Sequence, residues 1–154
     1  MYKDMEGRII GLNRFPERKK PAIQEEEVQL QKDLGIVGDF HGDGERNQIS
    51  IQTYELKKWM DKQPIRGHCF WRFKENVLLE GISLNECTAG DLIVCGDVVL
   101  EITDFVKRCY PDICEFASTG TYCNVPDEVR YARVKQGGIL RTGTAIEIIK
   151  QEER

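Results

Sequence analysis

The sequence predicts a mostly β fold, a closed or half-closed β-barrel of short strands with a few short helices. Short apolar or alternating runs recur along the chain, and glycine-containing turns separate them. Many short strands joined by such turns are typical of barrels, in which closure removes the exposed sheet edges. Segments with helical spacing are few, which argues against a doubly wound α/β fold. The 154 residues fit a single domain over positions 1–154.

The individual elements follow from hydrophobic periodicity and turn residues. We predict strands at residues 7–12, 28–31, 47–52, 92–95, 98–103, 131–134, 139–140 and 145–149. Surface loops are expected at 14–27, where prolines and charges accumulate, and at 33–45, where glycines break any regular pattern. Thr53 is placed to cap a short helix over residues 54–60.

The segment 92–103 carries the clearest hairpin signal. LIVC and VVLEIT flank Gly96-Asp97, a two-residue turn whose first position requires the positive φ that glycine accepts. The alternation of a strand then places Val98, Leu100 and Ile102 on one face.

Composition and charge exclude two classes of partner. The 22 basic and 26 acidic residues are interspersed and give a formal net charge of -4. The basic cluster Arg18-Lys19-Lys20 is followed by Glu25-Glu26-Glu27 and lacks the interleaved aromatics of a nucleic-acid surface. No apolar run approaches the roughly 20 residues that span a bilayer, and no signal-like segment opens the chain. We therefore expect a cytoplasmic protein that binds neither nucleic acid nor membranes.

The cysteines point to thiol chemistry. Six cysteines without a secretory signal indicate reduced thiols, metal ligands or a reactive cysteine rather than a disulfide framework. Cys109, Cys114 and Cys123 share one segment. Lys107 and Arg108 directly precede the first, and neighbouring cations favour the thiolate, the form that attacks sulfur. We predict Cys109 and Cys114 as the catalytic thiols. The other three cysteines are scattered along the chain and are expected to be small buried residues: Cys69, Cys87 and Cys95.

Other interpretations of this segment stay open. Cys109, Cys114 and Cys123 can bind zinc with a fourth ligand such as His68, although the gap in the first pair is at the edge of structural zinc spacing. Cys109 and Cys114 can also form a regulatory disulfide. Alternatively, the two can work together, with one thiol carrying the sulfur and the other resolving it. We assign no metal ligand.

Polar residues near glycine turns form a candidate pocket for an anionic or heterocyclic ligand. In GIVGDFHG and the residues after it, a carboxylate, an imidazole and a guanidinium come close in sequence. FKENV and YARV extend the set. For each motif alone, a polar surface turn or a solvent-facing arginine is the alternative interpretation. The predicted binding residues are Asp39, His41, Arg46, Gln48, Glu75, Asn76, Lys107, Arg108 and Arg133.

Taken in order, these segments resemble the MOSC family, named for the C-terminal domain of molybdenum cofactor sulfurases. The likeness spans about 34–149 and is carried by GIVGDFHG, NQISI, FKENV with EGISL, GDVVLEIT, KRC, the further cysteines and YARVKQGGILRTG. It is closest to the branch related to modules fused to molybdenum cofactor biosynthesis proteins. The resemblance implies a β-barrel and a cysteine, matched by Cys109, that carries sulfur as a persulfide.

The resemblance also implies molybdenum cofactor (molybdopterin) as ligand. In fused relatives the domain follows a pyridoxal-phosphate-dependent cysteine desulfurase. The expected partners are therefore a separate cysteine desulfurase, which alone would bring pyridoxal phosphate, and an enzyme that makes or uses molybdenum cofactor. A non-catalytic module that binds this cofactor or a similar anion is the alternative function.

The chain departs from the family pattern at three places. The CYPDIC spacing is one residue longer than usual, Tyr110 stands where histidine is often found, and Gly143-Thr144 replaces Gly-Asp. The first two leave Cys109 and Cys114 as alternative reactive thiols.

Overall fold

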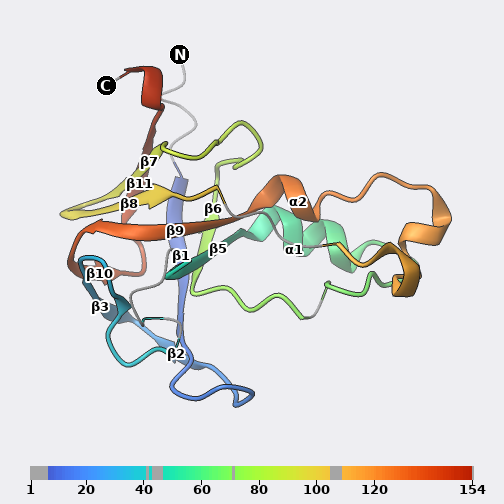
Figure 1. The fold of residues 1–154 in the computed structure, drawn as a ribbon, viewed down its shortest axis with the longest axis horizontal. Coiled ribbons are helices and arrows are strands. Elements are labelled where there is room, and N and C mark those ends of the chain that lie inside the picture. The colour runs from blue at the N-terminus through green and yellow to red at the C-terminus, as the bar shows by residue number, and fades with distance from the viewer. Residues whose placement is uncertain (1–6, 41, 43–46, 71, 105–108, 154) are drawn as a thin grey trace.

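The computed structural model describes residues 7–40, 42, 47–70, 72–104 and 109–153 (Figure 1). Its main sheet contains the strands β1 (Gly7–Arg14), β5 (Ile49–Thr53), β6 (Val77–Glu80), β7 (Leu92–Cys95), β8 (Val98–Ile102), β9 (Val129–Gln136) and β11 (Ala145–Ile149). Around the ring the order is β1, β11, β7, β8, β9, β5 and β6, and the pairing of β1 with both β11 and β6 closes the barrel. Of these contacts only β5–β6 is parallel. The predicted barrel is confirmed.

Smaller elements surround the barrel. They are β2 (Ile23–Glu25), β3 (Glu27–Gln31), β4 (Gly35–Ile36), β10 (Gly138–Arg141), α1 (Tyr54–Asp61), α2 (Val125–Glu128), and the 3-10 turns η2 (Pro111–Ile113), η3 (Ala117–Thr119) and η4 (Gln151–Glu153). Strand β2 pairs with the end of β1 but is not part of the closed ring. Strands β10, β3 and β4 form a separate three-stranded sheet. Thr53 caps α1 as predicted, because its hydroxyl accepts the Leu56 N–H at 3.3 Å.

Side-chain alternation along the strands fills the barrel with aliphatic residues. Val98, Leu100 and Ile102 are buried together, as the hairpin pattern predicts. Gly96 has φ +62, the left-handed conformation that the turn requires. Among the described residues, the fully buried large side chains of this core are Ile9, Leu12, Ile36, Ile49, Ile51, Leu79, Leu84, Ile93, Leu100, Ile102 and Leu140.

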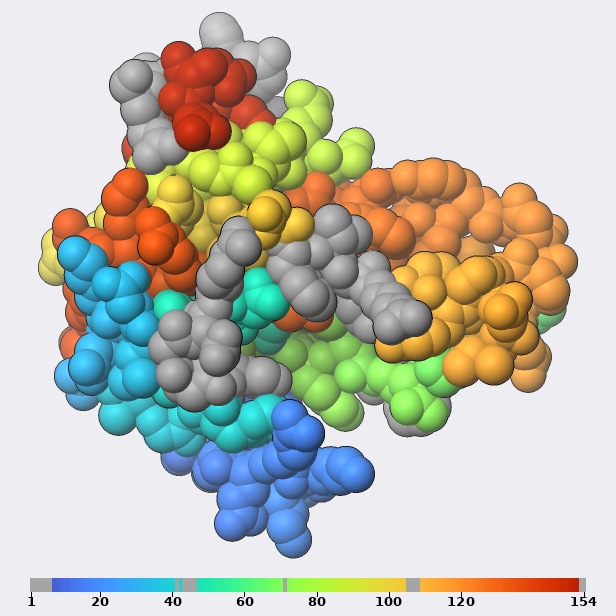
Figure 2. Space-filling view, in the orientation of Figure 1, coloured from blue at the N-terminus to red at the C-terminus, as the bar shows by residue number. Residues whose placement is uncertain are grey.

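A second, smaller core lies outside the barrel. Trp59, Phe70 and Phe116 meet pairwise with ring centroids 5.3–5.4 Å apart. These rings join α1 to the long segments 62–73 and 109–124, and the three together with α2 form a projection that we call the aromatic lobe (Figures 1 and 2). Among the described residues, no helix is long and apolar enough to cross a membrane.

Two predicted loops contain short strands. Within 14–27, residues 23–25 pair with the end of β1, and within 33–45, residues 35–36 pair with β3. Both strands have only two or three residues, too few for alternation to be visible in the sequence. The structure also adds β6, which the prediction omitted.

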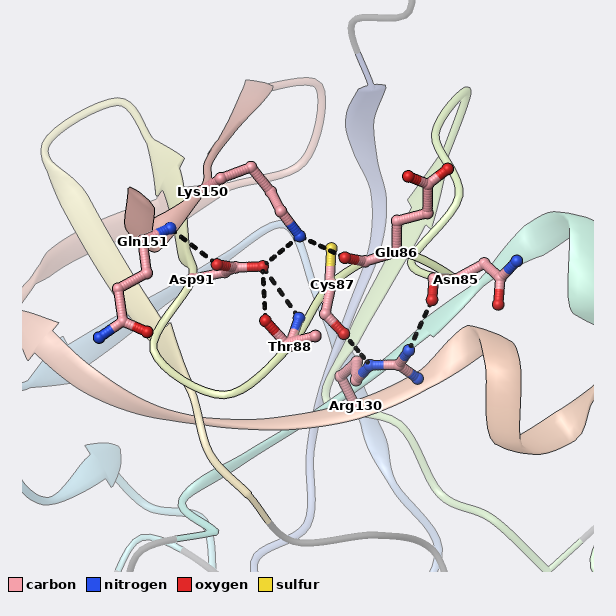
Figure 3. Close-up of polar contacts among 8 residues, drawn as sticks. All are labelled: Asn85, Glu86, Cys87, Thr88, Asp91, Arg130, Lys150 and Gln151. Carbon is pink, nitrogen blue, oxygen red and sulfur yellow. Dashed lines mark hydrogen bonds and ion pairs between the residues drawn. The ribbon is translucent and has the colours of Figure 1, made fainter. Parts of the chain in front are cut away.

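The C-terminal end of β11 is anchored by a buried carboxylate. Asp91 has no exposed surface, and its oxygens accept hydrogen bonds from Lys150 Nζ at 2.7 Å, the Thr88 N–H at 2.9 Å and the Gln151 N–H at 2.9 Å (Figure 3). Burial would raise the pKa of Asp91, but these hydrogen bonds outweigh it and lower the pKa. Lys150 also donates to the Glu86 carbonyl and lies beside Cys87. One charged cluster thus fastens the chain after β11 to the loop before β7.

Replacing this carboxylate should destabilise the fold in a pH-dependent way. Asp91→Asn should lower the free energy of unfolding by about 2 kcal/mol at neutral pH, because charged hydrogen bonds are lost. Since folding lowers the pKa of Asp91, its contribution is complete above the ordinary value of 3.8 and declines as pH falls through the lower folded-state pKa. Denaturant unfolding of both proteins from neutral to acid pH measures the difference. Asp97→Asn in the exposed β7–β8 turn is the control, and a deficit that does not shrink in acid would contradict the assignment.

Candidate functional site

A cavity of about 600 Å³ opens where the barrel meets the aromatic lobe. Its size suits a small organic ligand, for which pockets of about 300–1,000 Å³ are usual. The lining residues are Phe15, Lys19, Lys20, Pro21, Phe40, Asn47, Ser50, Arg72, Phe73, Lys74 and Tyr131. They come from the loop after β1, the glycine-rich loop after β4, strand β5, the segment before β6, and β9. A second cavity of about 250 Å³ shares several of these residues and reaches Glu75.

Aromatic rings form the walls of the larger cavity. Phe15 and Phe40 meet edge to face with centroids 6.5 Å apart, and their backbones are joined by a 2.8 Å hydrogen bond. Phe73 and Tyr131 form a second edge-to-face pair at 5.8 Å. Burial raises the pKa of Tyr131 to about 12, so its hydroxyl remains a donor at neutral pH. Such walls suit a flat heterocycle.

Cations surround the same cavity. Lys19, Lys20, Arg72 and Lys74 line it, and its described lining includes no acidic residue. Lys19, Lys20 and Lys74 form no salt bridge with any other described residue. An anionic group would therefore meet several positive charges that are not already neutralised. The cavity combines a positive rim with aromatic walls.

Asn76, a predicted ligand residue, instead joins the segments that build the cavity. It is fully buried, and its side-chain oxygen accepts the Ser50 N–H at 2.9 Å while its amide nitrogen donates to the Asn13 carbonyl and to Asp39 Oδ1, both at 3.1 Å. The same Asp39 oxygen accepts the Phe15 N–H at 2.6 Å. Asp39 and Asn76 thus position the cavity walls and do not themselves line the larger cavity.

Glu75 and Gln48 are also buried and internally bonded. Glu75 Oε1 accepts Gln52 Nε2 at 3.0 Å, and Oε2 pairs with Lys57 Nζ at 2.9 Å. Gln48 accepts the Val134 N–H at 2.9 Å inside the barrel. Glu75 contributes to the second cavity, whereas Gln48 lines neither cavity.

The remaining predicted binding residues divide into two groups. Arg133 lies on the exposed face of β9, where its guanidinium pairs with Glu101 at 2.7 Å, and it does not line the cavity. His41, Arg46, Lys107 and Arg108 lie outside the described residues.

The thiols gather on the aromatic lobe. Cys109 is exposed, whereas Cys69, Cys114 and Cys123 are half-buried and pack against the aromatic cluster. The His68 N–H donates to Cys114 Sγ at 3.3 Å. The His68 ring also meets the Tyr110 ring at 5.7 Å between centroids. These contacts bring the turn that carries Cys69 against the segment that carries Cys109.

The pKa of the Cys123 thiol is raised above its ordinary value. Burial raises the pKa of Cys123; a hydrogen bond from the Val125 backbone opposes this, and negative charge on Cys69, Cys109 and Cys114 raises it further. The two barrel cysteines are separate from this group. Cys87 and Cys95 are buried, as predicted, and burial raises the pKa of Cys87 to about 11 and that of Cys95 to about 12. Cys69, which the sequence also predicted to be buried, is only half-buried.

The thiols and the cavity share a wall. The Cys69 carbonyl accepts the backbone N–H groups of Arg72 at 3.2 Å and Phe73 at 3.3 Å, and both of these residues line the cavity. Negative charge on Cys69 adds to the effect of burial in raising the pKa of the Tyr131 phenol. The turn 69–73 therefore belongs to both features. In the described part of the chain, no three His, Cys, Asp or Glu side chains are arranged to hold a metal ion.

Solved structures share this fold. The YuaD protein from Bacillus subtilis superposes with a TM-score of 0.72 and 22% identity over 97% of this chain and 99% of that one. YiiM from Escherichia coli gives a TM-score of 0.60 and 18% identity over 95% of this chain and 74% of that one. YuaD and YiiM are MOSC-domain proteins. The fold fits the MOSC family. No family model and no curated protein sequence matches the chain.

The predicted binding residues do not include those that line the larger cavity. The run Arg18-Lys19-Lys20 does not indicate a nucleic-acid surface, because acidic residues follow it and interleaved aromatics are lacking, yet two of its members line the cavity. The alternation of aromatic and basic residues in Arg72-Phe73-Lys74 was a usable signal, because it resembles a stacking and anion-binding strip. Cys69 gave no local signal, since its partners lie about forty or more residues further along the chain.

The buried network and the exposed ion pair should differ sharply in energetic weight. Asn76→Ala should lower the free energy of unfolding by about 2–3 kcal/mol, because buried donors and acceptors on β1 and β5 lose their partners. Arg133→Ala should change it by less than about 1 kcal/mol, since exposed salt bridges contribute little. Chemical denaturation of both variants measures this. Equal losses would contradict the structural role given to Asn76.

Proposed function

We propose that this chain is a sulfur-handling MOSC-like domain in which Cys109 accepts sulfane sulfur as a persulfide, beside a cavity for a molybdopterin-type ligand. One observation carries the proposal: a cation-rimmed, aromatic-walled cavity shares the turn 69–73 with a group of thiols. The exposed Cys109 provides the entry point for sulfur. The predicted alternative for the reactive thiol, Cys114, is half-buried and accepts a backbone hydrogen bond, so it is less accessible to a protein donor.

The residues present suit molybdopterin. A pterin ring is flat and matches walls such as Phe73 and Tyr131, and a phosphate is an anion suited to Lys20 and Lys74. When bound, the cofactor would supply a molybdenum centre held by its dithiolene sulfurs. The role of Asp39 and Asn76 in this proposal is to hold the cavity walls in place rather than to contact the ligand.

Sulfur uptake by Cys109 needs no oxidant. The Cys109 thiolate attacks the terminal sulfur of a donor persulfide, a new S–S bond forms on Cys109, and the donor departs as a thiolate. A separate cysteine desulfurase, with its own pyridoxal phosphate, is the class of partner that generates such a persulfide. The acceptor would be molybdenum cofactor or an enzyme that makes or uses it.

Treatment with inorganic polysulfide should add one sulfur atom to Cys109. Exposure makes this thiol accessible, whereas Cys87 and Cys95 are buried and protonated, with pKa values raised by burial to about 11 and about 12. Peptide mass spectrometry after thiol blocking reads the site of addition, and Cys109→Ser is the matched control. Absence of the added sulfur from Cys109 under conditions that persulfidate a free cysteine peptide would refute the carrier role.

The cavity itself favours a second candidate, a binding module without covalent chemistry. Its described lining residues include no cysteine, so ligand binding does not require a thiol. In that case a Cys109→Ser variant keeps both ligand affinity and cellular function. The carrier proposal instead requires this variant to lose its cellular function.

The lysines of the cavity should govern anion binding. Lys20→Gln combined with Lys74→Gln should weaken binding of the fluorescent, air-oxidised pterin phosphate made from molybdopterin by roughly tenfold or more, because charged hydrogen bonds are lost. Lys135→Gln, at an exposed position of β9, is the charge-matched control and should bind as wild type. Fluorescence titration at two salt concentrations measures affinity, and an unchanged affinity in the double variant would place the ligand elsewhere.

A further inference from the structure

The smaller cavity, of about 250 Å³, is lined by a buried carboxylate, which the described lining of the larger cavity lacks. Glu75 supplies it, and Gln52 lies beside it in the same lining. Both are almost completely shielded from solvent, since the Glu75 side chain is 8% exposed and Gln52 is 2% exposed. A few polar groups that converge on a cavity are the usual means of orienting a ligand. The sulfur chemistry of Cys109 does not use this pair.

The oxygens of this pair retain capacity to accept hydrogen bonds. Glu75 Oε1 accepts Gln52 Nε2 at 3.0 Å and Oε2 pairs with Lys57 Nζ at 2.9 Å, so each oxygen has one protein partner. An ionised carboxylate has about four acceptor positions. Within the described part of the chain, Oε1 of Gln52 accepts no hydrogen bond, although the residue is buried. Because a buried acceptor without a donor is costly, this arrangement suits a ligand that donates several hydrogen bonds.

The surrounding elements hold these acceptors in place. The Asn13 side chain donates to the Glu75 backbone carbonyl at 3.3 Å, and the next residue, Asn76, is bonded to both β1 and β5. Gln52 belongs to β5 in the closed barrel, and Lys57 belongs to α1, which begins directly after that strand. A recognition site on such regular elements is ordered before the ligand binds.

The two cavities share a wall and two cations. Phe15, Lys20, Pro21, Phe73 and Lys74 line both of them. Because Phe73 belongs to both linings, a flat ring that packs on it in the larger cavity can extend one edge into the smaller cavity. Lys20 and Lys74 then remain available to a phosphate on the same ligand. The shared residues therefore supply the wall and the positive charge, and the smaller cavity supplies acceptors for the ring edge.

We propose that the smaller cavity recognises the aminopyrimidinone edge of a heterocyclic ligand, and that Glu75 determines this specificity. The edge presents a ring N–H beside an exocyclic amino group, two neighbouring donors that match the two oxygens of a carboxylate. The second N–H of the amino group is available to Gln52 Oε1. Pterins and guanine both carry this edge. The inference rests on the proposed function for the pterin as ligand, but it does not depend on the chemistry of Cys109.

A comparison of two ligands on the unmodified protein is the first test. Hydroxymethylpterin phosphate carries the edge, whereas its lumazine counterpart has an oxygen in place of the amino group. The protein should bind the pterin roughly tenfold or more tightly, because the lumazine oxygen would face the carboxylate and a charged hydrogen bond would be lost. Fluorescence titration measures both affinities. Equal affinities would refute the proposal whether or not any variant folds.

Variants then assign the preference to one side chain. Glu75→Gln should abolish or reverse it, because the amide can donate an N–H to the lumazine oxygen. The readout is the ratio of the two affinities, which a general loss of binding does not change. Lys57→Gln removes the same ion pair but keeps the carboxylate, so it should still prefer the pterin. Glu101→Gln, on β8 and outside both cavities, should behave as wild type. An unchanged ratio in Glu75→Gln would overturn the proposal.

GMP identifies the source of the ring, since guanine carries the same edge. Tighter binding of GMP than of the pterin phosphate, with the same dependence on Glu75, would support recognition of the edge and overturn the pterin as ligand. If neither compound binds the wild type, the proposed ligand and this inference both fail. If the pterin phosphate binds without discrimination against the lumazine, this inference alone fails and the proposed function stands.

Discussion

The buried amide of Asn76 is the constraint on which the site depends. Its side chain and backbone bond to Asn13 at the end of β1, to Ser50 on β5 and to Asp39 in the loop after β4. Inside a protein an unpaired polar group is costly, so a fully bonded amide of this kind specifies one arrangement of the segments that it joins. Those segments also carry the aromatic walls and cations of the cavity. The geometry of the cavity is therefore determined by hydrogen bonds among buried residues that do not line it.

The architecture was predictable where each local signal agreed with its neighbours. The hairpin β7–β8 combines alternating apolar residues with a glycine at the position that requires positive φ. The predictions that Leu100 lies on the buried face and that Gly96 begins the turn are therefore both confirmed. Strands β2 and β4 were not predictable, since two or three residues carry no period and form only because β1 and β3 present an edge to pair with. Pairing across the chain, rather than local preference, determines such strands.

The sequence predicted polar ligand-binding residues in the glycine-rich segments but not the contacts that those residues make. Asp39 and Asn76 use their hydrogen-bonding groups within the protein. A carboxylate that binds a ligand and one that fastens a loop have the same sequence signature, because both need an acidic residue beside a flexible backbone. The charges that line the cavity come instead from lysines on exposed segments. The grouping of Cys69 with Cys123 arises only when the lobe folds.

The cavity and the lobe thiols occupy different parts of the molecule that meet at one turn. The cavity depends on the closed barrel, in which every strand has two partners, whereas the thiols depend on a lobe held by a few aromatic contacts. Closure into a barrel constrains the strands more than a few ring contacts constrain the lobe, so the two parts differ in rigidity. The turn 69–73 links the two, because the Cys69 carbonyl holds the amides of Arg72 and Phe73. The position of the Cys69 backbone and the shape of the cavity wall are therefore linked through two hydrogen bonds.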